Sequence, residues 1–216
     1  MKKGFTIAEV LITLGIIGIV TVITLPTLIA KHRKNLIETR LKNFYTTINQ
    51  AIKMAEADYG DKKDWFSPLP EECESDKDSQ NCLQTFYDKY LKKYLIVHKV
   101  FYNTEYKDDN FNSLWIYFAN GSGVKLKYAG HDYIFYPEAA KMQDENRINC
   151  KDRFYFGFYP NTTVESIVQN YRNKGIEPYI NSNWDGTRED LINKRYCAKL
   201  IQLNNWQIPD DYPIKP

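Results

Sequence analysis

Residues 4–30 read GFTIAEVLITLGIIGIVTVITLPTLIA, an apolar run that is long enough to cross a membrane. The 21 residues from Val10 to Ala30 carry no formal charge. At a rise of about 1.5 Å per residue, a helix of that length measures roughly 30 Å, which matches the hydrocarbon core of a bilayer. The run therefore predicts a transmembrane helix over residues 5–30. Its one acid, Glu9, is costly in lipid and requires an explanation.

Two cleavage positions flank this segment. A secretory signal peptide would be cut after its apolar core at small residues, and Pro26, Thr27 and Ala30 offer only a weak site of that kind. The other position lies before the apolar run, between Gly4 and Phe5. A cut there would remove residues 1–4 as a short basic leader peptide.

The second position resembles the type IV prepilin signal, which type IV pilins and type II secretion pseudopilins share. The residues that carry the resemblance are Lys2, Lys3, Gly4, Phe5, Thr6 and Glu9, followed by Pro26. The resemblance covers about residues 1–55. It implies that a membrane-embedded prepilin peptidase cuts after Gly4 and methylates the new amino terminus at Phe5. It also implies a pilin-like fold and assembly through the helix at residues 5–30.

Glu9 has two interpretations. On a helix it shares a face with Phe5, four residues earlier, so its carboxylate can favour its own helix N-terminus. Alternatively, helices stacked with an axial offset place Glu9 of one subunit beside the amine of Phe5 in a neighbour. That pairing would offset the desolvation of both charges and fix the stagger between subunits. We favour the second interpretation, because a capping acid could lie in the interface at less cost.

Three residues weaken the same helix: Gly15, Gly18 and Pro26. In a helix interior glycine costs about 1 kcal/mol relative to alanine, and proline about 3 kcal/mol. Membrane helices tolerate both residues, which is the simpler explanation. The prepilin resemblance implies a second one, that part of this region melts in the assembled filament.

The basic cluster at residues 31–34, KHRK, conflicts with the leader charges Lys2 and Lys3. By the positive-inside rule alone it would hold the rest of the chain in the cytoplasm. The resemblance places the N-terminus inside, so we interpret residues 31–34 as facing lipid headgroups. The expected location is the bacterial cytoplasmic (inner) membrane, crossed once, with an exported C-terminal domain that later joins a cell-surface or periplasmic filament.

An amphipathic helix continues the first one over residues 31–59. Its apolar positions recur every three or four residues and are Ile37, Leu41, Phe44, Ile48, Ala51 and Ala55. This period of 3.5 predicts a core-facing stripe, and Gly60 marks the stop. One helix over residues 5–59 would be roughly 80 Å long, with its second half under a globular head.

Residues 60–216 have the length of one domain and hold most of the 17 tyrosines and 11 phenylalanines. The charged, proline-containing residues 61–81 predict a surface loop. Asn120-Gly121-Ser122-Gly123 predicts a hairpin between two strands. The expected strands span 95–102, 114–118, 124–128, 133–136 and 153–159, and the expected helices span 163–173 and 188–203. The fold class is therefore α+β, with a small antiparallel sheet packed on the long helix.

Four cysteines allow three complete pairings: they are Cys73, Cys82, Cys150 and Cys197. Export favours disulfides, and the simplest scheme pairs Cys73 with Cys82 and Cys150 with Cys197. The resemblance implies that the second bond encloses a C-terminal exposed region. Zinc is the alternative, but no CxxC pair occurs.

A calcium loop is a further candidate, with oxygen ligands at Asn181, Asn183, Asp185 and Glu189. Their alternating spacing around Gly186 is similar to a calcium-binding loop, and the resemblance adds that major pseudopilins bind calcium in a late loop. The twelfth position is Ile192, which lacks the bidentate carboxylate. The alternative is a turn that Thr187 caps at the start of the last helix.

No motif for catalysis occurs in the sequence. Its three histidines, His32, His98 and His131, are scattered, and it has no phosphate-binding glycine loop. The net charge of +2 does not indicate nucleic acid as a partner. We therefore expect a protein that is not an enzyme and, calcium aside, has no cofactor.

Three functions remain. The first is a structural subunit of a type IV pilus-like or type II secretion pseudopilus filament. The second is a minor or tip adhesive pilin that uses the same stem, and the third is a membrane-anchored envelope protein unrelated to filaments. The partners expected for the first two are other pilin subunits, the prepilin peptidase, an inner-membrane assembly platform and membrane lipid.

Overall fold

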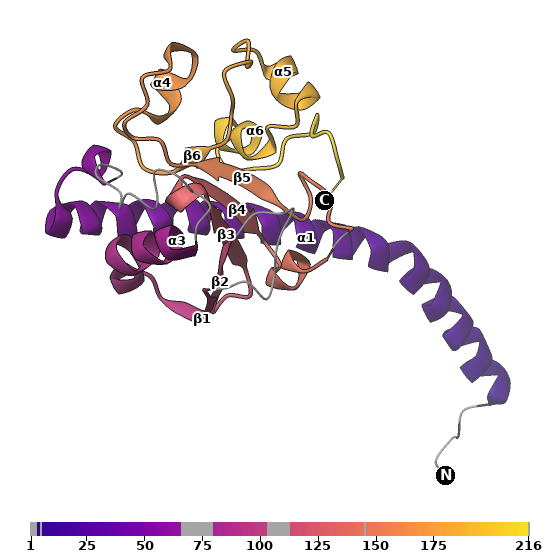
Figure 1. The fold of residues 1–216 in the computed structure, drawn as a ribbon. Helices are drawn as coiled ribbons and strands as arrows, with labels where there is room; N and C mark the ends of the chain where they lie inside the picture. The colour runs from indigo at the N-terminus through magenta and orange to yellow at the C-terminus, as the bar shows by residue number, and fades with distance from the viewer. Residues whose placement is uncertain (1–3, 5, 66–79, 103–112, 145, 216) are drawn as a thin grey trace.

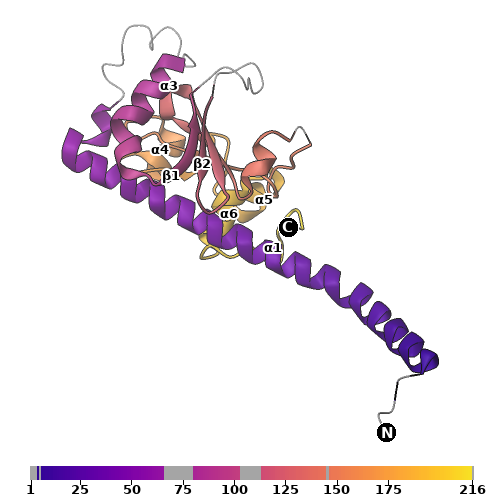
Figure 2. The ribbon, with the colours of Figure 1, turned by 90° about the horizontal axis from the view of Figure 1, so that it is seen from below.

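The computed structural model describes residue 4 and residues 6–65, 80–102, 113–144 and 146–215. A helix of 53 residues, α1 (Ile7–Tyr59), dominates it. Thr6 caps the helix, and Gly60, with a φ of 84°, ends it. Figures 1 and 2 show that the second half of α1 lies across the globular head, which residues 60–216 form. The first half, residues 7–33, projects away from the head and is called the stem below. The predicted continuous helix and its stop at Gly60 are confirmed.

The stem is helical throughout, including Gly15, Gly18 and Pro26. Figure 1 shows that it curves away from the direction of the head-bound half. Proline removes one backbone hydrogen bond and crowds the preceding turn. Thr21 and Thr24 donate their hydroxyls to the carbonyl oxygens four residues earlier, at 2.7 and 2.9 Å, a contact that also bends helices. The curvature therefore follows from residues in the stem itself.

The head contains one antiparallel sheet whose six strands lie in chain order. The strands are β1 (Val97–Phe101), β2 (Leu114–Phe118), β3 (Gly123–Lys127), β4 (Asp132–Tyr136), β5 (Phe154–Gly157) and β6 (Glu177–Pro178). The predicted hairpin at residues 120–123 joins β2 to β3. The five predicted strands are all present, whereas the two-residue strand β6 was not predicted.

One face of the sheet packs on α1 and forms the main core. Every residue of the predicted stripe on α1 is buried there, and Ile52 joins it. Phe44 is central: its ring stacks on Phe135 at 4.4 Å and meets Phe156 edge-on at 5.2 Å. Because successive strand residues alternate between faces, the same strands present a second face away from α1, with its own cluster around Trp115 and Tyr136.

Short helices complete the head: α3 (Gln80–Phe86), α4 (Glu165–Tyr171), α5 (Arg188–Asn193) and α6 (Cys197–Leu203). The helix α3 continues through a π turn, Tyr87–Leu91, and a 3-10 turn, Lys92–Tyr94. It was not predicted, and it begins inside the stretch expected to be a loop. In Figure 1 the helices α4, α5 and α6 gather on the β6 side of the sheet.

The single helix predicted over residues 188–203 is wrong, because the chain breaks between α5 and α6. Arg195 adopts a left-handed φ of 57°, and the amide of Tyr196 donates to the carbonyl of Leu191 at 2.9 Å. The apolar residues on the two sides of this break pack in different places. Leu191 lies in a small cluster with Tyr171, whereas Ile201 lies in the main core.

Candidate functional site

The stem exposes a continuous apolar surface. Between Ile7 and Ile29, fourteen large aliphatic side chains are each 44–81% exposed. The most apolar 18-residue window of α1 has a mean hydropathy of 2.4. The helix is therefore long enough and apolar enough to cross a membrane. Apolar patches on soluble monomers rarely exceed a few hundred Å². The stem therefore has the character of a membrane anchor or a signal sequence.

Glu9 caps the helix that contains it. Its carboxylate accepts hydrogen bonds from the backbone amide and the hydroxyl of Thr6, both at 2.8 Å. In return, the hydroxyl of Thr6 accepts the amide of Glu9 at 3.3 Å, which completes a capping box. The structure thus contains the local interpretation of Glu9. The contact between subunits stays a prediction, since a single chain has no neighbour.

The expected processing position lies just ahead of this cap. Gly4 is exposed and precedes the helix, and a side chain added there would meet no atom within 4 Å. Phe5, the expected new terminus and methylation site, lies outside the described residues.

At the base of the stem, Arg33 binds the head. Its guanidinium pairs with Asp152 at 2.7 Å and lies 3.6 Å from a carboxylate oxygen of Glu138. Asp152 is only 5% exposed and also accepts the amide of Ile148 at 2.8 Å. The prediction that all of residues 31–34 face lipid headgroups is therefore wrong for Arg33. Lys31 and His32 are exposed, as a headgroup-facing patch requires.

Further polar contacts fasten the second half of α1 to loops of the head. Arg40 donates to the carbonyls of Pro137 and Asn120, and Glu38 accepts the amide of Ile208 at 2.8 Å. These contacts hold the hairpin turn and the C-terminal segment against one helix. The apolar pattern of the helix does not predict these polar contacts, because Glu38 and Arg40 lie beside the apolar stripe.

Further along α1, Tyr45 and Asn49 bind the β6 edge of the sheet. The hydroxyl of Tyr45 donates to Glu177 at 2.9 Å. Burial and the nearby charge of Glu177 raise the pKa of Tyr45 to about 12. The side-chain amide of Asn49 donates to the backbone carbonyls of Tyr45 and Ile176 at 3.0 and 3.2 Å. The strand β6 is therefore anchored by α1 as well as by β5.

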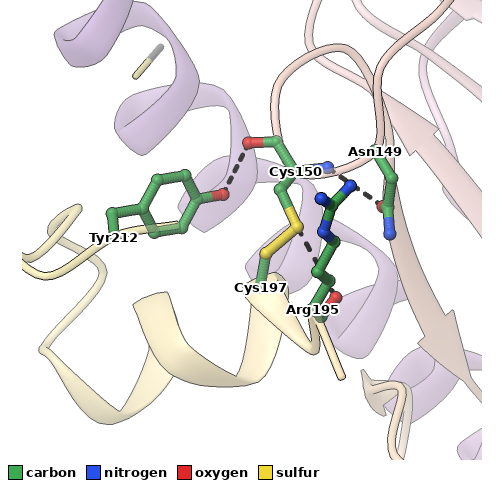
Figure 3. The surroundings of a disulfide bond; sticks show 5 residues. All are labelled: Asn149, Cys150, Arg195, Cys197 and Tyr212. Carbon is green, nitrogen blue, oxygen red and sulfur yellow. Dashed lines mark hydrogen bonds between the residues drawn. A yellow bond between two sulfur atoms is a disulfide. The ribbon is translucent and has the colours of Figure 1, made fainter. Parts of the chain in front are cut away.

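A disulfide joins Cys150 and Cys197, as predicted, and ties the turn before β5 to the start of α6. Figure 3 shows its surroundings: the hydroxyl of Tyr212 donates to the carbonyl of Cys150 at 2.6 Å, so the C-terminal segment is attached at the same point. The carbonyl oxygen of Arg195 lies 3.5 Å from the sulfur of Cys150. Cys82 is also disulfide-bonded. Cys73 lies outside the described residues, and with it the predicted pair Cys73–Cys82.

The candidate calcium loop is a capped turn. Asn181 accepts the amide of Asn183 at 2.9 Å, and Asp185 accepts the amide and hydroxyl of Thr187 at 2.8 and 2.7 Å. The hydrogen bonds from Thr187 lower the pKa of Asp185. Thr187 caps α5, as the alternative interpretation predicted.

A cation of the chain itself lies beside this loop. The ammonium of Lys194 pairs with Asp190 at 2.8 Å and donates to the carbonyl of Asn183, while Glu189 is exposed. Within the described ranges, no three His, Cys, Asp or Glu side chains group as metal ligands. Calcium binding at this loop stays a prediction.

Comparison with known proteins identifies a family for the head and the lower stem. Residues 27–216 match the model of DUF6613, a family of unknown function. No curated protein and no solved structure matches the chain. The match begins at residue 27, after the residues that carry the prepilin resemblance, so it neither supports nor opposes that resemblance. Because it covers most of the chain, the protein belongs to DUF6613.

Proposed function

We propose that this protein is a structural subunit of a filament of the type IV pilus or type II secretion pseudopilus kind. It would be processed after Gly4 at the bacterial inner membrane, methylated at Phe5 and assembled through its stem, with the head exported. The observation that carries the proposal is the division of α1. Its first half is apolar and exposed, and its second half is built into the core of the head.

The apolar side chains of the stem surround the helix rather than forming one stripe. Residues 10, 11, 12 and 20, at about 100° per residue, point near 0°, 100°, 200° and 280° around the axis, and all are exposed. A helix that is apolar on every side suits a membrane span or the centre of a bundle. The stem can therefore exchange lipid for neighbouring stems, which is what filament assembly requires of it.

The capping box gives Glu9 a specific role in that exchange. Before assembly, the hydrogen bonds from Thr6 partly replace the water that the carboxylate loses in lipid. After cleavage the new amine would lie on Phe5, the residue next to Thr6. Two contacts then compete for this carboxylate: the cap of its own helix and the amine of a neighbouring subunit. Assembly favours the contact with the neighbouring subunit when the axial stagger brings its amine beside the Glu9 carboxylate.

The test uses the full chain in its source bacterium. Mass spectrometry of the mature protein should find an N-terminal peptide that begins with N-methylated Phe5, and sheared extracellular or periplasmic filaments should contain the protein. A chain that retains residues 1–4 would contradict the proposal and favour a membrane-anchored envelope protein. Abundance in the sheared fraction would further separate a major subunit from a minor tip subunit.

The role of Glu9 is tested by Glu9→Leu, with Thr13→Leu as its matched control one turn further along the same face. The hydroxyl of Thr13 donates to the carbonyl of Val10 at 2.9 Å, a contact within its own helix. We expect Glu9→Leu to lower the sheared-filament yield at least about tenfold, since 1.4 kcal/mol per added subunit suffices for that factor. Thr13→Leu should leave the yield unchanged. Equal yields for both variants, at equal membrane levels, would refute the register contact.

A further inference from the structure

We propose that the head binds an acidic saccharide in a cavity between the sheet and the break that separates α5 from α6. The cavity has a volume of about 420 Å³, within the usual range for small-molecule sites. Strands β3 to β5 line one side of it, and residues 194–198 line the other. Ile134 and Tyr155 come from the sheet face that carries the cluster around Trp115, whereas Phe154 and Phe156 belong to the main core. This inference concerns the head alone and does not depend on the filament proposal.

Tyrosines from four separate segments line the cavity: Tyr128, Tyr155, Tyr179 and Tyr196. All four are half-buried, and the rings of Tyr179 and Tyr196 lie edge-on at 6.3 Å. A tyrosine combines a flat apolar ring with a polar tip. The rings suit the C–H faces of a sugar, and the hydroxyls suit its hydroxyl groups. A wholly apolar ligand would offer no hydrogen bonds to the tyrosine hydroxyl groups.

The charges at the cavity favour an anion. Its lining holds three cationic side chains, Lys127, Lys194 and Arg195, against one carboxylate, Asp132. Asp132 accepts a hydrogen bond from Tyr159, Lys194 pairs with Asp190, and Lys127 is buried and also has an interaction partner, so Arg195 supplies the positive charge that is open to a ligand. The exposed guanidinium of Arg195 forms no ion pair with any side chain in the described part of the chain. A guanidinium matches the two oxygens of a carboxylate, which an acidic sugar supplies.

The backbone of the cavity is held in an unusual conformation on both sides. Tyr128 and Arg195 have φ values of 50° and 57°, in the left-handed region that residues other than glycine rarely adopt. Such conformations persist where the surroundings enforce them, and they concentrate at ligand sites. Here the disulfide at Cys197, two residues after Arg195, fixes this wall, so the cavity is formed before a ligand arrives.

Size, rings and charge together select the ligand class. A small inorganic anion would satisfy Arg195 but leave the tyrosine rings unused. A neutral sugar would use the rings but not the cations. A ligand of one or two sugar rings that carries a carboxylate, such as a uronic acid, uses both.

Binding should be measured on the full chain in a detergent without a sugar headgroup. The probes are galacturonate dimer, the neutral dimer lactose, and benzoate as an aromatic carboxylate without hydroxyls. We expect saturable binding of the galacturonate dimer in calorimetry, with saturation transfer from the protein to its ring protons, and at least tenfold weaker binding of the other two. Absence of galacturonate binding, or equal affinity for lactose or benzoate, would overturn the proposal.

Arg195→Gln tests the carboxylate contact, with Arg172→Gln as the matched control. Arg172 is an exposed arginine at the end of α4 and does not line the cavity. We expect the affinity for galacturonate dimer to fall about tenfold with Arg195→Gln, the usual loss for a deleted hydrogen bond to a charged group, and to stay unchanged with Arg172→Gln. Equal affinity of both variants would refute the assignment. An unchanged urea midpoint for Arg195→Gln verifies that the variant is folded.

Discussion

Gly175 is the position where one added methyl group should loosen the long helix from the head. A Cβ atom there would overlap the carboxamide oxygen of Asn49 and lie 2.9 Å from its Cγ. The same carboxamide donates to the carbonyl of Ile176 at 3.2 Å and so joins α1 to β6. Gly175→Ala must therefore displace the Asn49 side chain, and the contact with Ile176 is lost with it.

The magnitude follows from the groups involved. Losing this hydrogen bond and leaving a partly buried carbonyl unpaired costs about 1–2 kcal/mol of unfolding free energy. Asn49→Ala should cost a similar amount, reduced slightly because alanine favours the helix. In the Asn49→Ala background the overlap no longer exists, so Gly175→Ala should be neutral or stabilise by about 0.5 kcal/mol. The free energy of unfolding of the double variant should then exceed the value expected from adding the two single losses by about 1–2 kcal/mol.

Urea unfolding of the full chain in non-ionic detergent, followed by the fluorescence of its four tryptophans, measures these differences. The control is Asn43→Ala, an exposed asparagine on the same helix, which should be neutral or slightly stabilising. Additive costs for Gly175→Ala and Asn49→Ala would refute the reasoning, because two changes that act on one contact cannot add independently.

Three further predictions concern the head. Replacing Cys150 and Cys197 by serine should lower the free energy of unfolding by about 4 kcal/mol, the loop-entropy value for a separation of 47 residues, in urea unfolding of the oxidised protein; a loss under about 1 kcal/mol would contradict it. Phe44→Ala should cost about 3–5 kcal/mol and Phe44→Leu clearly less, because the ring stacks against the sheet; equal costs in the same assay would show that the ring contacts contribute nothing. Hydrogen bonds from Arg188 lower the pKa of Asp211, so its contribution to stability is present above about pH 4 and is lost as the pH falls through the lowered value. The thermal midpoint should therefore lose part of its dependence on pH below 4 in Asp211→Asn, and an unchanged profile would show that the pair does not stabilise the fold.

Local patterns were sufficient to predict most of the secondary structure. The stripe from Ile37 to Ala55 repeats with the period of a helix, and its residues are buried as that period requires. The turn residues 120–123 marked a hairpin whose strands pair as expected. The observed pair Cys150–Cys197 belongs to the simplest of the three complete pairings. The break at Arg195 escaped prediction, because the apolar pattern continues across it while its residues pack into two different clusters.

The long helix, its apolar first half, its core-facing second half and the α+β class could be predicted from the sequence, because each depends on residues a few positions apart. The polar side chains that fasten this helix to the head could be identified from the three-dimensional structure alone. Arg33 meets Asp152 across 119 residues of chain, and Asn49 meets Ile176 across 127. The tyrosine-lined cavity likewise gathers side chains from four separate segments. No pattern within a short window predicts such contacts, because they form only when the sheet closes against α1 and the disulfide fixes α6 beside it.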